Sequence, residues 1–309
     1  MKPYYHDEKA GITIYHGKAE DVLPTLERGS VSLVVCDGPY AMKKAAWDMM
    51  PMAELGAWYR PHIEAWNTVC APSATVYLWG SAESWAAIHP EAQAAGWTFR
   101  GLITWHKTNA QSQATDKEAA RMWPDVTEVC GMYQREGFPR ELRLARSVGA
   151  TTLSHVARAC GCDSRLPALW EGYPSVHGSC APTREQWNKA MSACGLHEMQ
   201  REEVWAKYRP THFELPPGVT NVWPHPIVAG AERLKGSAGA LHPCQKPLSF
   251  ARRMIAASSR PGDTALDVFM GSGGVLVAAK ELGRRAIGID SDEKSCAMTA
   301  ERLAQEVLF

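Results

Sequence analysis

A strand, a glycine-rich turn and a helix follow one another in the stretch TALDVFMGSGGVLVAAKEL, residues 264–282. The apolar run 264–268 predicts a buried strand, and residues 274–282 carry apolar side chains at helical spacing. Glycines at such a turn let the backbone approach a ligand and direct the helix N-terminus towards it. Asp290 ends the following strand, roughly 20 positions on, where folds of this kind hydrogen-bond a ribose diol. The stretch therefore predicts an α/β fold that binds a nucleoside cofactor.

The same alternation of strands and helices extends outward on both sides of this stretch. The strands that we expect are 12–15, 31–36, 75–79, 99–105, 126–133, 264–268 and 285–290. The helices that we expect are 20–27, 52–69, 81–95, 247–259, 274–282 and 292–307. This order predicts a largely parallel sheet with crossover helices.

The strand pattern stops at about Arg135 and returns only after the proline-interrupted stretch LPPGVTNVWPHP, residues 215–226. A chain of 309 residues is longer than a typical domain of about 100 to 200 residues. We therefore predict that residues 1–134 and 213–309 form the two halves of one α/β domain, and that 135–212 form a helical insertion.

Composition excludes several classes of protein. With 45% hydrophobic and 21% charged residues and no apolar run of ~18 residues, the chain has no sign of a membrane span or of wholesale disorder. The N-terminus does not resemble a secretory signal, and nine cysteines without a regular framework favour a reducing, cytoplasmic location without disulfides. The 33 basic residues balance the 33 acidic ones, so net charge makes no case for a nucleic-acid partner.

Three short segments, far apart in the chain, carry the strongest chemical signal. They are Asp37-Gly38-Pro39-Tyr40, His242-Pro-Cys-Gln245-Lys246-Pro, and Asp267-x-Phe269-x-Gly271-Ser272-Gly273 with Asp290 at the end of the next strand. Together they resemble the DPPY tetrapeptide, the HPxQKP segment and the cofactor turn of the amino DNA methyltransferases, which use S-adenosylmethionine. The tetrapeptide comes first and the turn last, as in the circularly permuted β class, whose target-recognition region lies between them. The insertion 135–212 occupies that place.

The resemblance implies a Rossmann-like sheet and a role for each motif. It assigns cofactor binding to Asp267, Phe269, Gly271, Ser272, Gly273 and Asp290, with His242, Gln245 and Lys246 closing the methionine end. It assigns catalysis to the tetrapeptide, in which Asp37 and the carbonyl of Gly38 accept hydrogen bonds from an exocyclic amine and Tyr40 stacks on the flipped-out base. The family usually has proline where this chain has Gly38, and a freer backbone at that position makes the loop less preorganised.

The first residue of the tetrapeptide indicates which base is modified. Aspartate is typical of enzymes that act on N6 of adenine and serine of those that act on N4 of cytosine, so Asp37 predicts adenine in double-stranded DNA. Methylation of cytosine N4 stays open, because this is a tendency. Gly38, and Lys18 where the family has aspartate, leave open a DNA-binding regulator with an inactive methyltransferase core. The chain shows no nuclease motif, and the sequence leaves the oligomeric state open, a homodimer included.

DNA contacts are expected in two places. Beside the tetrapeptide they are Trp47, His106 and Lys107, and in the insertion they are Arg165 and Arg184. The segment 152–172 resembles a helix-turn-helix of the phage-repressor type, although Pro167 stands where its second helix should run, so a plain helical bundle is the alternative. Cysteines and histidines of the insertion lack the CxxC spacing of common zinc sites, which favours buried thiols and no metal.

Overall fold

The protein is described by a computed structural model that covers residues 1–110, 125–135, 137–162, 183–208, 212–214, 218–236, 239–240 and 244–304. Two compact units make up the chain. One unit comprises Met1–Gln134 and His212–Phe309 and contains the sheet, and the other comprises Arg135–Thr211 and is helical.

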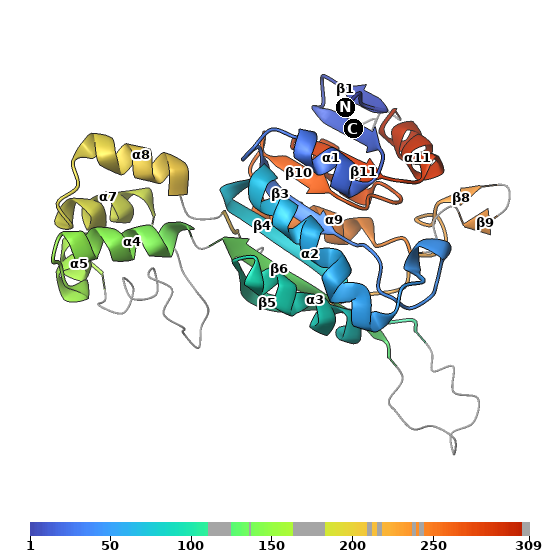
Figure 1. Ribbon diagram of the computed structural model, residues 1–309, viewed down its shortest axis with the longest axis horizontal. Helices are drawn as coiled ribbons and strands as arrows, with labels where there is room; N and C mark the ends of the chain where they lie inside the picture. Colours follow the sequence, from blue (N-terminus) through green and yellow to red (C-terminus); the bar gives the residue numbers. More distant parts are fainter. Residues whose placement is uncertain are drawn as a thin grey trace, which may run out of the picture. The chain divides into compact units, whose positions relative to one another are not determined.

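A nine-stranded sheet in the order β1-β2-β11-β10-β3-β4-β6-β5-β7 forms the centre of the first unit (Figure 1). Its strands are β1 Tyr5–Asp7, β2 Ile12–His16, β3 Val31–Cys36, β4 Cys70–Gly80, β5 Trp97–Lys107, β6 Thr127–Arg135, β7 Val222–His225, β10 Thr264–Asp267 and β11 Arg285–Asp290. A separate two-stranded ribbon pairs β8 Lys235–Gly236 with β9 Gly239–Ala240. The strands β2, β11, β10, β3 and β4 run parallel to one another, whereas β6 is antiparallel to β4. The carboxyl ends of β11, β10 and β3 therefore meet at one edge of the sheet.

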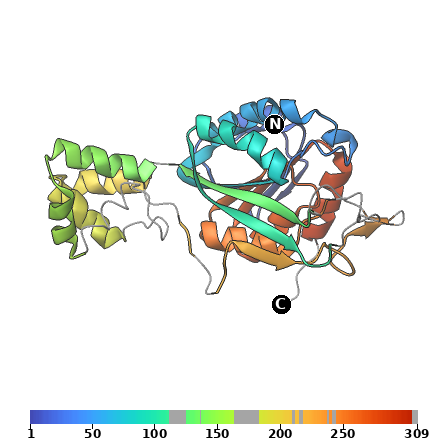
Figure 2. The same cartoon turned by 90° about the horizontal axis from the view of Figure 1, so that it is seen from below.

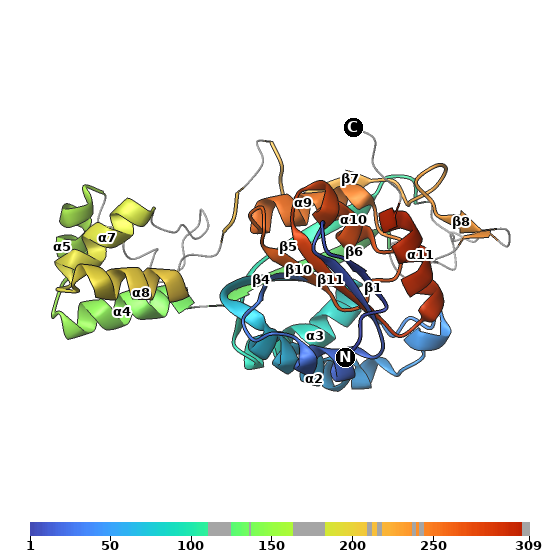
Figure 3. The same cartoon turned by 90° about the horizontal axis from the view of Figure 1, so that it is seen from above.

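Helices cover both faces of this sheet. They are α1 Ala19–Val22, α2 Met52–Val69, α3 Ala82–Ala94, α9 Leu248–Ser258, α10 Gly274–Glu281 and α11 Glu293–Ala304, with short 3-10 turns η1 Leu23–Thr25 and η2 Ala46–Asp48. Figure 2 and Figure 3 show α2 and α3 on one face and α9, α10 and α11 on the other. Leu33 and Val35 of β3 belong to the core under α9 and α10, while Val34 and Cys36 belong to the core under α2. A strand buried on both faces is apolar at nearly every position, which is why β3 reads as VSLVVC.

Several elements depart from the sequence-based expectation. The helix expected at 20–27 is only one turn long before it tightens into η1, whose Pro24 has no N–H to continue the α-helical ladder. The strands β1 and β7 were not predicted. Both lie at edges of the sheet, and β7 contains Pro224, a residue that strands accept only at an edge or an end.

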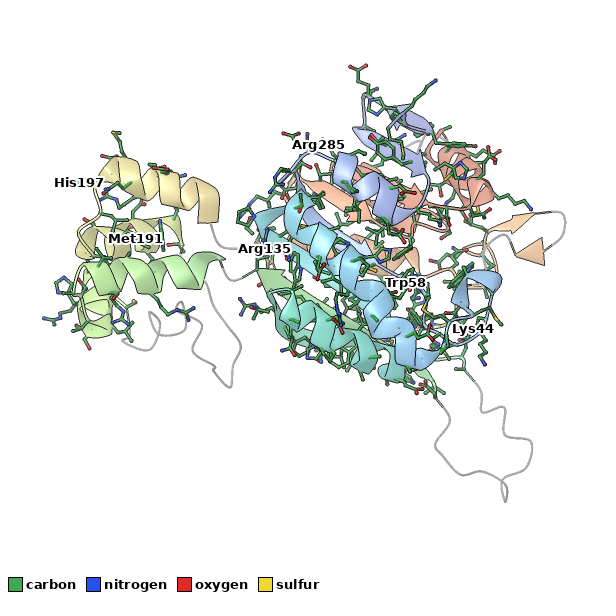
Figure 4. The ribbon with its side chains drawn as sticks, viewed as in Figure 1. Lys44, Trp58, Arg135, Met191, His197 and Arg285 are labelled. Atoms are coloured by element: carbon green, nitrogen blue, oxygen red, sulfur yellow. The ribbon has the colours of Figure 1, made fainter. Side chains whose placement is uncertain are left out.

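The helical unit contains α4 Gly137–Val148, α5 Leu153–Cys160, α7 Arg184–Ala193 and α8 Glu198–Tyr208 among its described residues. Its core includes Val156, Trp187 and Met191, the last of which is labelled in Figure 4. The hydroxyl of Thr152 caps α5, and Gly161 ends it in the left-handed conformation, as the first half of a helix-turn-helix would require. The second helix of that motif falls on residues 163–182, outside the described residues.

Neither unit contains a membrane-spanning candidate, because no helix within the described ranges combines sufficient length with sufficient apolar character. The described residues also include no group of three or more histidine, cysteine or acidic side chains placed to hold a metal ion. Cys160 instead lies in the apolar core of the helical unit, where its thiol donates to the carbonyl of Gln186 at 3.3 Å.

Candidate active site

Three neighbouring strands each lead to an aspartate at the same edge of the sheet. Asp290 ends β11, Asp267 ends β10, and Asp37 directly follows β3. All three line one cleft of about 360 Å³ in the first unit. This is where open parallel sheets bind their ligands, outside the carboxyl ends of the strands.

Backbone amides fix the Asp290 end of the cleft. The N–H of Gly271 donates to Oδ2 of Asp290 at 2.8 Å, and the N–H of Asp292 donates to Oδ1 at 2.9 Å. Gly271 and Gly273 have φ angles of 47° and 71°, which side chains with a Cβ rarely adopt. A Cβ on Gly273 would also lie within 2.9 Å of the side chain of Thr299. The glycine-rich turn is therefore shaped by backbone geometry before any ligand binds.

Asp267 sits between the two other carboxylates and is 4% exposed. Burial raises the pKa of this carboxyl well above its usual value, and the charges of Asp37 and Asp290 raise it further, although the N–H of Phe269 opposes the shift. The side chain is therefore neutral over a wider range of pH than an exposed aspartate. A cation placed beside it would reverse that effect.

A smaller cavity of about 210 Å³ adjoins the cleft, and Phe269 contributes to both. Gly17, Lys18 and Trp58 line this cavity, and the Trp58 and Phe269 rings lie 5.7 Å apart at an interplanar angle of 30°. Trp58 is labelled on α2 in Figure 4. The aromatic wall suits a flat ring, and Lys18 stands where the resemblance would place an aspartate.

Side chains hold the opposite end of the cleft, around Asp37. The ammonium of Lys246 lies 2.7 Å and 2.8 Å from the two carboxylate oxygens, and the hydroxyl of Tyr40 donates to Oδ1 at 2.6 Å. Burial opposes the charge on Lys246, but its attraction to Asp37 and Glu128 outweighs that cost and raises the pKa of the ammonium. Burial likewise raises the pKa of Tyr40 well above its usual value, with a contribution from the Asp37 charge. The tyrosine is therefore a hydroxyl donor at neutral pH.

Glu128, from β6, also lines the cleft and extends this polar cluster. Its carboxylate lies 3.1 Å from the Lys246 ammonium and 2.8 Å from that of Lys107. Burial would raise the pKa of Glu128, but the two ammonium groups outweigh it and lower the pKa. Two anions and two cations thus alternate in the order Asp37, Lys246, Glu128, Lys107, so each charge has an opposite neighbour.

Gly38 occupies a position with no room for a side chain. A Cβ built there would lie 2.7 Å and 2.8 Å from ring carbons of Phe269 and nearer still to the hydroxyl of Tyr59. That hydroxyl donates to the carbonyl of Pro39 at 3.1 Å, and Tyr59 is fully buried. The tyrosine therefore fills the space beside the tetrapeptide and ties down the backbone that the glycine leaves free.

Asp48 organises the loop after the tetrapeptide. Its Oδ1 accepts from the N–H groups of Tyr40 and Ala41 at 2.7 Å each, and its Oδ2 accepts from Met42 at 3.1 Å and Lys44 at 3.2 Å. The side chain is 2% exposed. Four backbone amides converge on one buried carboxylate, so the loop closes around it.

The comparison with protein families identifies the class of protein to which this site belongs. The sequence profile of the N6/N4 methylases, described as "DNA methylase", matches residues 31–301. The chain belongs to this family. The match includes the tetrapeptide, the insertion and the glycine-rich turn.

Curated relatives of this methylase extend over almost its whole length. It is 24% identical over 321 residues to the type II methyltransferase M2.DpnII of Streptococcus pneumoniae, which covers 99% of this chain and 93% of that protein. It is 23% identical to the type II methyltransferase M2.LlaDCHI of Lactococcus lactis subsp. cremoris, with 98% and 92% of the two chains covered.

Solved structures share the fold of the methylase. The PvuII DNA methyltransferase (cytosine-N4-specific) superposes with a TM-score of 0.62 at 12% identity, covering all of this chain and 91% of that one. The M1.HpyAVI–SAM complex superposes with a TM-score of 0.52 at 18% identity, covering 94% and 99%. At these identities the likeness shows a common Rossmann-like methyltransferase fold.

The expected site residues fall into three groups in the methylase. The cleft is lined by Asp37, Gly38, Pro39, Tyr40, Trp47, Lys246, Asp267, Phe269, Gly271, Ser272 and Asp290, with Gly273 capping α10 behind them. Three others lie elsewhere: Gln245 binds the backbone of Glu232 and Leu234, Lys107 pairs with Glu128, and Arg184 pairs with Glu202. His106 is an exposed residue of β5, while His242 and Arg165 lie outside the described residues.

Sequence reasoning missed Glu128, Tyr59 and the role of Asp48. Glu128 comes into the site because β6 pairs with β4 in the middle of the sheet, and no local motif marks that pairing. Asp48 had a local signal, because aspartate side chains readily accept hydrogen bonds from nearby backbone N–H groups in turns.

Proposed function

We propose that this methylase transfers a methyl group from S-adenosylmethionine to N6 of adenine in double-stranded DNA. The observation that carries the proposal is a single cleft with a backbone-shaped end at Asp290 and a polar end at Asp37 and Tyr40. A cofactor at the first end and a base at the second end would lie side by side. The family membership supports the reaction class, and the leading Asp37 of the tetrapeptide supports adenine.

The residues at the first end suit S-adenosylmethionine. Asp290 would accept hydrogen bonds from the ribose hydroxyls, while Asp267 lies where a positive group would favour its ionised form. Phe269 and Trp58 would hold the adenine ring of the cofactor in the smaller cavity. When bound, the cofactor supplies an electrophilic methyl group on a sulfonium.

Asp37 has a free acceptor position for the amine of the base. A carboxylate has about four lone-pair positions. Among the described residues, Oδ1 accepts from Lys246 and Tyr40, and Oδ2 accepts from Lys246 alone. The remaining position on Oδ2, together with the Gly38 carbonyl, would hold the two amine hydrogens and direct the nitrogen lone pair at the methyl carbon. After methylation the nitrogen would carry one proton too many, and Oδ2 of Asp37, which already accepts from it, would pass that proton to solvent.

Tyr40 would position the ring of the base. An enzyme that modifies a base edge must extrude that base from the duplex, at a cost of a few kcal/mol. The Tyr40 ring lines the cleft, and its hydroxyl is fixed by Asp37 and lies 3.1 Å from the Lys246 ammonium. A ring held in this way offers a stacking face without further ordering.

Mass spectrometry of nucleosides from DNA incubated with the protein and S-adenosylmethionine tests the proposal. We expect N6-methyladenine that is absent from a reaction without protein. Detection of N4-methylcytosine instead would show that the target base is cytosine and not adenine. Absence of any methylated base, with folding and cofactor binding verified, would favour a DNA-binding regulator.

We also propose that residues 135–212 choose the target sequence. The helical unit is a separate compact body inserted between β6 and β7, and the resemblance places target recognition there. Arg184, at the start of α7, is exposed beside Glu202. Arg184→Ala and Arg165→Ala should change DNA affinity but not cofactor affinity, and loss of a base contact should cost about 1–3 kcal/mol and relax the methylated sequence. An unchanged methylation pattern after replacement of the whole insertion would place specificity elsewhere.

A further inference from the structure

The loop after the tetrapeptide exposes large apolar side chains. Met42, Trp47 and Met49 are 44%, 48% and 56% exposed, although they lie within eight residues of one another. Single exposed apolar residues are common on protein surfaces, but a concentration of them marks a contact surface. Trp47 also lines the cleft that contains Asp37. The apolar surface therefore borders the entrance to the site.

Two lysines lie between these apolar residues. Lys43 and Lys44 are both exposed, and Lys44, which is labelled in Figure 4, lines the same cleft as Trp47. The loop thus presents positive charge and apolar surface together. A nucleic-acid duplex offers the matching pair of features, since it has phosphates on the outside and stacked bases within.

Interactions within the protein fix the shape of this loop before any DNA binds. Ala41 and Lys43 have φ angles of 58° and 57°, a left-handed conformation that is unfavourable for residues with a Cβ. Such conformations persist where surrounding interactions over-determine them. The carboxylate of Asp48 supplies those interactions through its four backbone N–H bonds.

We propose that residues 41–49 form a preformed DNA-contacting lip, held in shape by Asp48 as a positioning residue. Met42 and Trp47 would pack against the base stack beside the position that the extruded base has left, and Lys43 and Lys44 would bind the flanking phosphates. In other proteins that kink the duplex, apolar side chains insert between neighbouring bases in a comparable way. The inference rests on the proposed function, because it requires a base to enter the cleft from a duplex.

The first experiment removes the apolar surface and leaves the carboxylate in place. The variant Met42→Ala/Trp47→Ala is compared with wild type for methyl transfer from labelled S-adenosylmethionine to unmethylated plasmid DNA. We expect KM for the plasmid to rise about tenfold or more, on the scale of one to two bases of lost stacking. The cofactor Kd from calorimetry should stay within twofold. The exposed Phe213→Ala, which does not line the cleft, is the matched control and should leave both constants unchanged.

The second experiment tests the lysines through salt. Each phosphate contact contributes about 0.9 to the slope of log affinity against log salt concentration for duplex DNA. Lys43→Ala/Lys44→Ala should therefore reduce the slope of log KM against log salt by roughly 2. An unchanged slope would show that the lysines do not bind phosphates and would contradict this part of the lip.

The third experiment tests Asp48 as a positioning residue. Asp48→Asn puts an amide NH₂ against backbone N–H groups, so the loop should open, with a higher KM for plasmid DNA and a lower kcat but an unchanged cofactor Kd. Asp263→Asn is the matched control, because Asp263 also accepts a backbone N–H, from Arg260 at 2.8 Å, in a turn outside the cleft.

The outcomes separate this inference from the proposed function. Wild-type protein that fails to methylate plasmid DNA would overturn the proposed function, and the lip with it. Active wild type with an unchanged plasmid KM in Met42→Ala/Trp47→Ala would overturn the lip alone. That double variant changes only exposed residues, so we expect it to fold. It therefore tests the lip even if Asp48→Asn does not fold.

Discussion

Asp290 and Asp37 mark the two ends of one cleft, and they are held in opposite ways. Backbone N–H groups of Gly271 and Asp292 hold Asp290, whereas the side chains of Lys246 and Tyr40 hold Asp37. Backbone groups in a turn cannot leave without unfolding it, but an ammonium on a flexible stem can move. The difference indicates a permanent geometry at the Asp290 end, where we propose that the cofactor binds, and an adjustable one at the Asp37 end, where we propose that the base binds.

Removing the adjustable carboxylate should have the largest effect on catalysis. Asp37→Ala deletes an acceptor that acts mainly in the reacting complex, so kcat should fall by about 100- to 1,000-fold. The cofactor Kd should stay within a few-fold, because Asp290 and the glycine turn are untouched. Steady-state methyl transfer and calorimetry measure the two quantities. If Asp37→Ala weakened cofactor binding as strongly as it slowed transfer, the two ends would not be separable.

Restoring the family's proline at position 38 should reduce activity. In Gly38→Pro the new ring would overlap Tyr59 and Phe269, and such overpacking lowers the free energy of unfolding by about 1–3 kcal/mol. Chemical denaturation and methyl transfer should both report the loss. Adding Tyr59→Phe removes the nearest atom and should recover part of it. A Gly38→Pro variant that is as stable as wild type and more active would contradict the fit that we describe.

Changing Asp290, at the fixed end of the cleft, should affect the binding of the cofactor more than the use of DNA. Asp290→Ala removes hydrogen-bond acceptors for the ribose and should weaken S-adenosylmethionine by about 1–3 kcal/mol in calorimetry. KM for plasmid DNA at saturating cofactor should stay within a few-fold. Undiminished cofactor affinity would mean that another residue binds the ribose.

The smallest expected effect is the release of a proton from Asp267 when the cofactor binds. Burial raises the pKa of Asp267, so the free protein holds a proton there at pH values where an exposed aspartate has lost it. A bound cationic cofactor should lower that pKa, so binding should release up to about one proton and strengthen as pH rises through the raised pKa. Calorimetry in buffers of different ionisation enthalpy measures the release, which Asp267→Asn should abolish. Equal enthalpies in all buffers for the wild type would show that Asp267 does not titrate on binding.

The sequence predicts best those elements whose chemistry is local. β3 and β11 have the predicted bounds, because each has an apolar centre covered by helices on both faces of the sheet. The glycine turn and its two acidic neighbours were recognisable because a tight turn requires glycine at particular positions. For these residues, the conformation is determined by neighbours within the same short segment, so the sequence alone predicts it.

Residues that act through distant pairing could not be predicted in the same way. The resemblance placed Lys246 near the cofactor, but its ion pair with Asp37, more than 200 positions away in the chain, was not predicted. Glu128 joins it only because two antiparallel strands meet in the sheet. Tyr59 compensates for Gly38 from the buried face of α2, which helical periodicity predicts as core but not as support for the tetrapeptide.

The interrupted order of the sheet has a consequence for biosynthesis. β3 pairs in parallel with β10, but roughly 230 residues, including the whole helical unit, are translated between them. At about 5–20 residues per second, one edge of an apolar strand waits roughly 10–45 s for its partner. The sheet is thus completed only when β10 has been translated. A ribosome that stalls within the helical unit would leave the edge of the valine-rich strand β3 open to pairing with other chains.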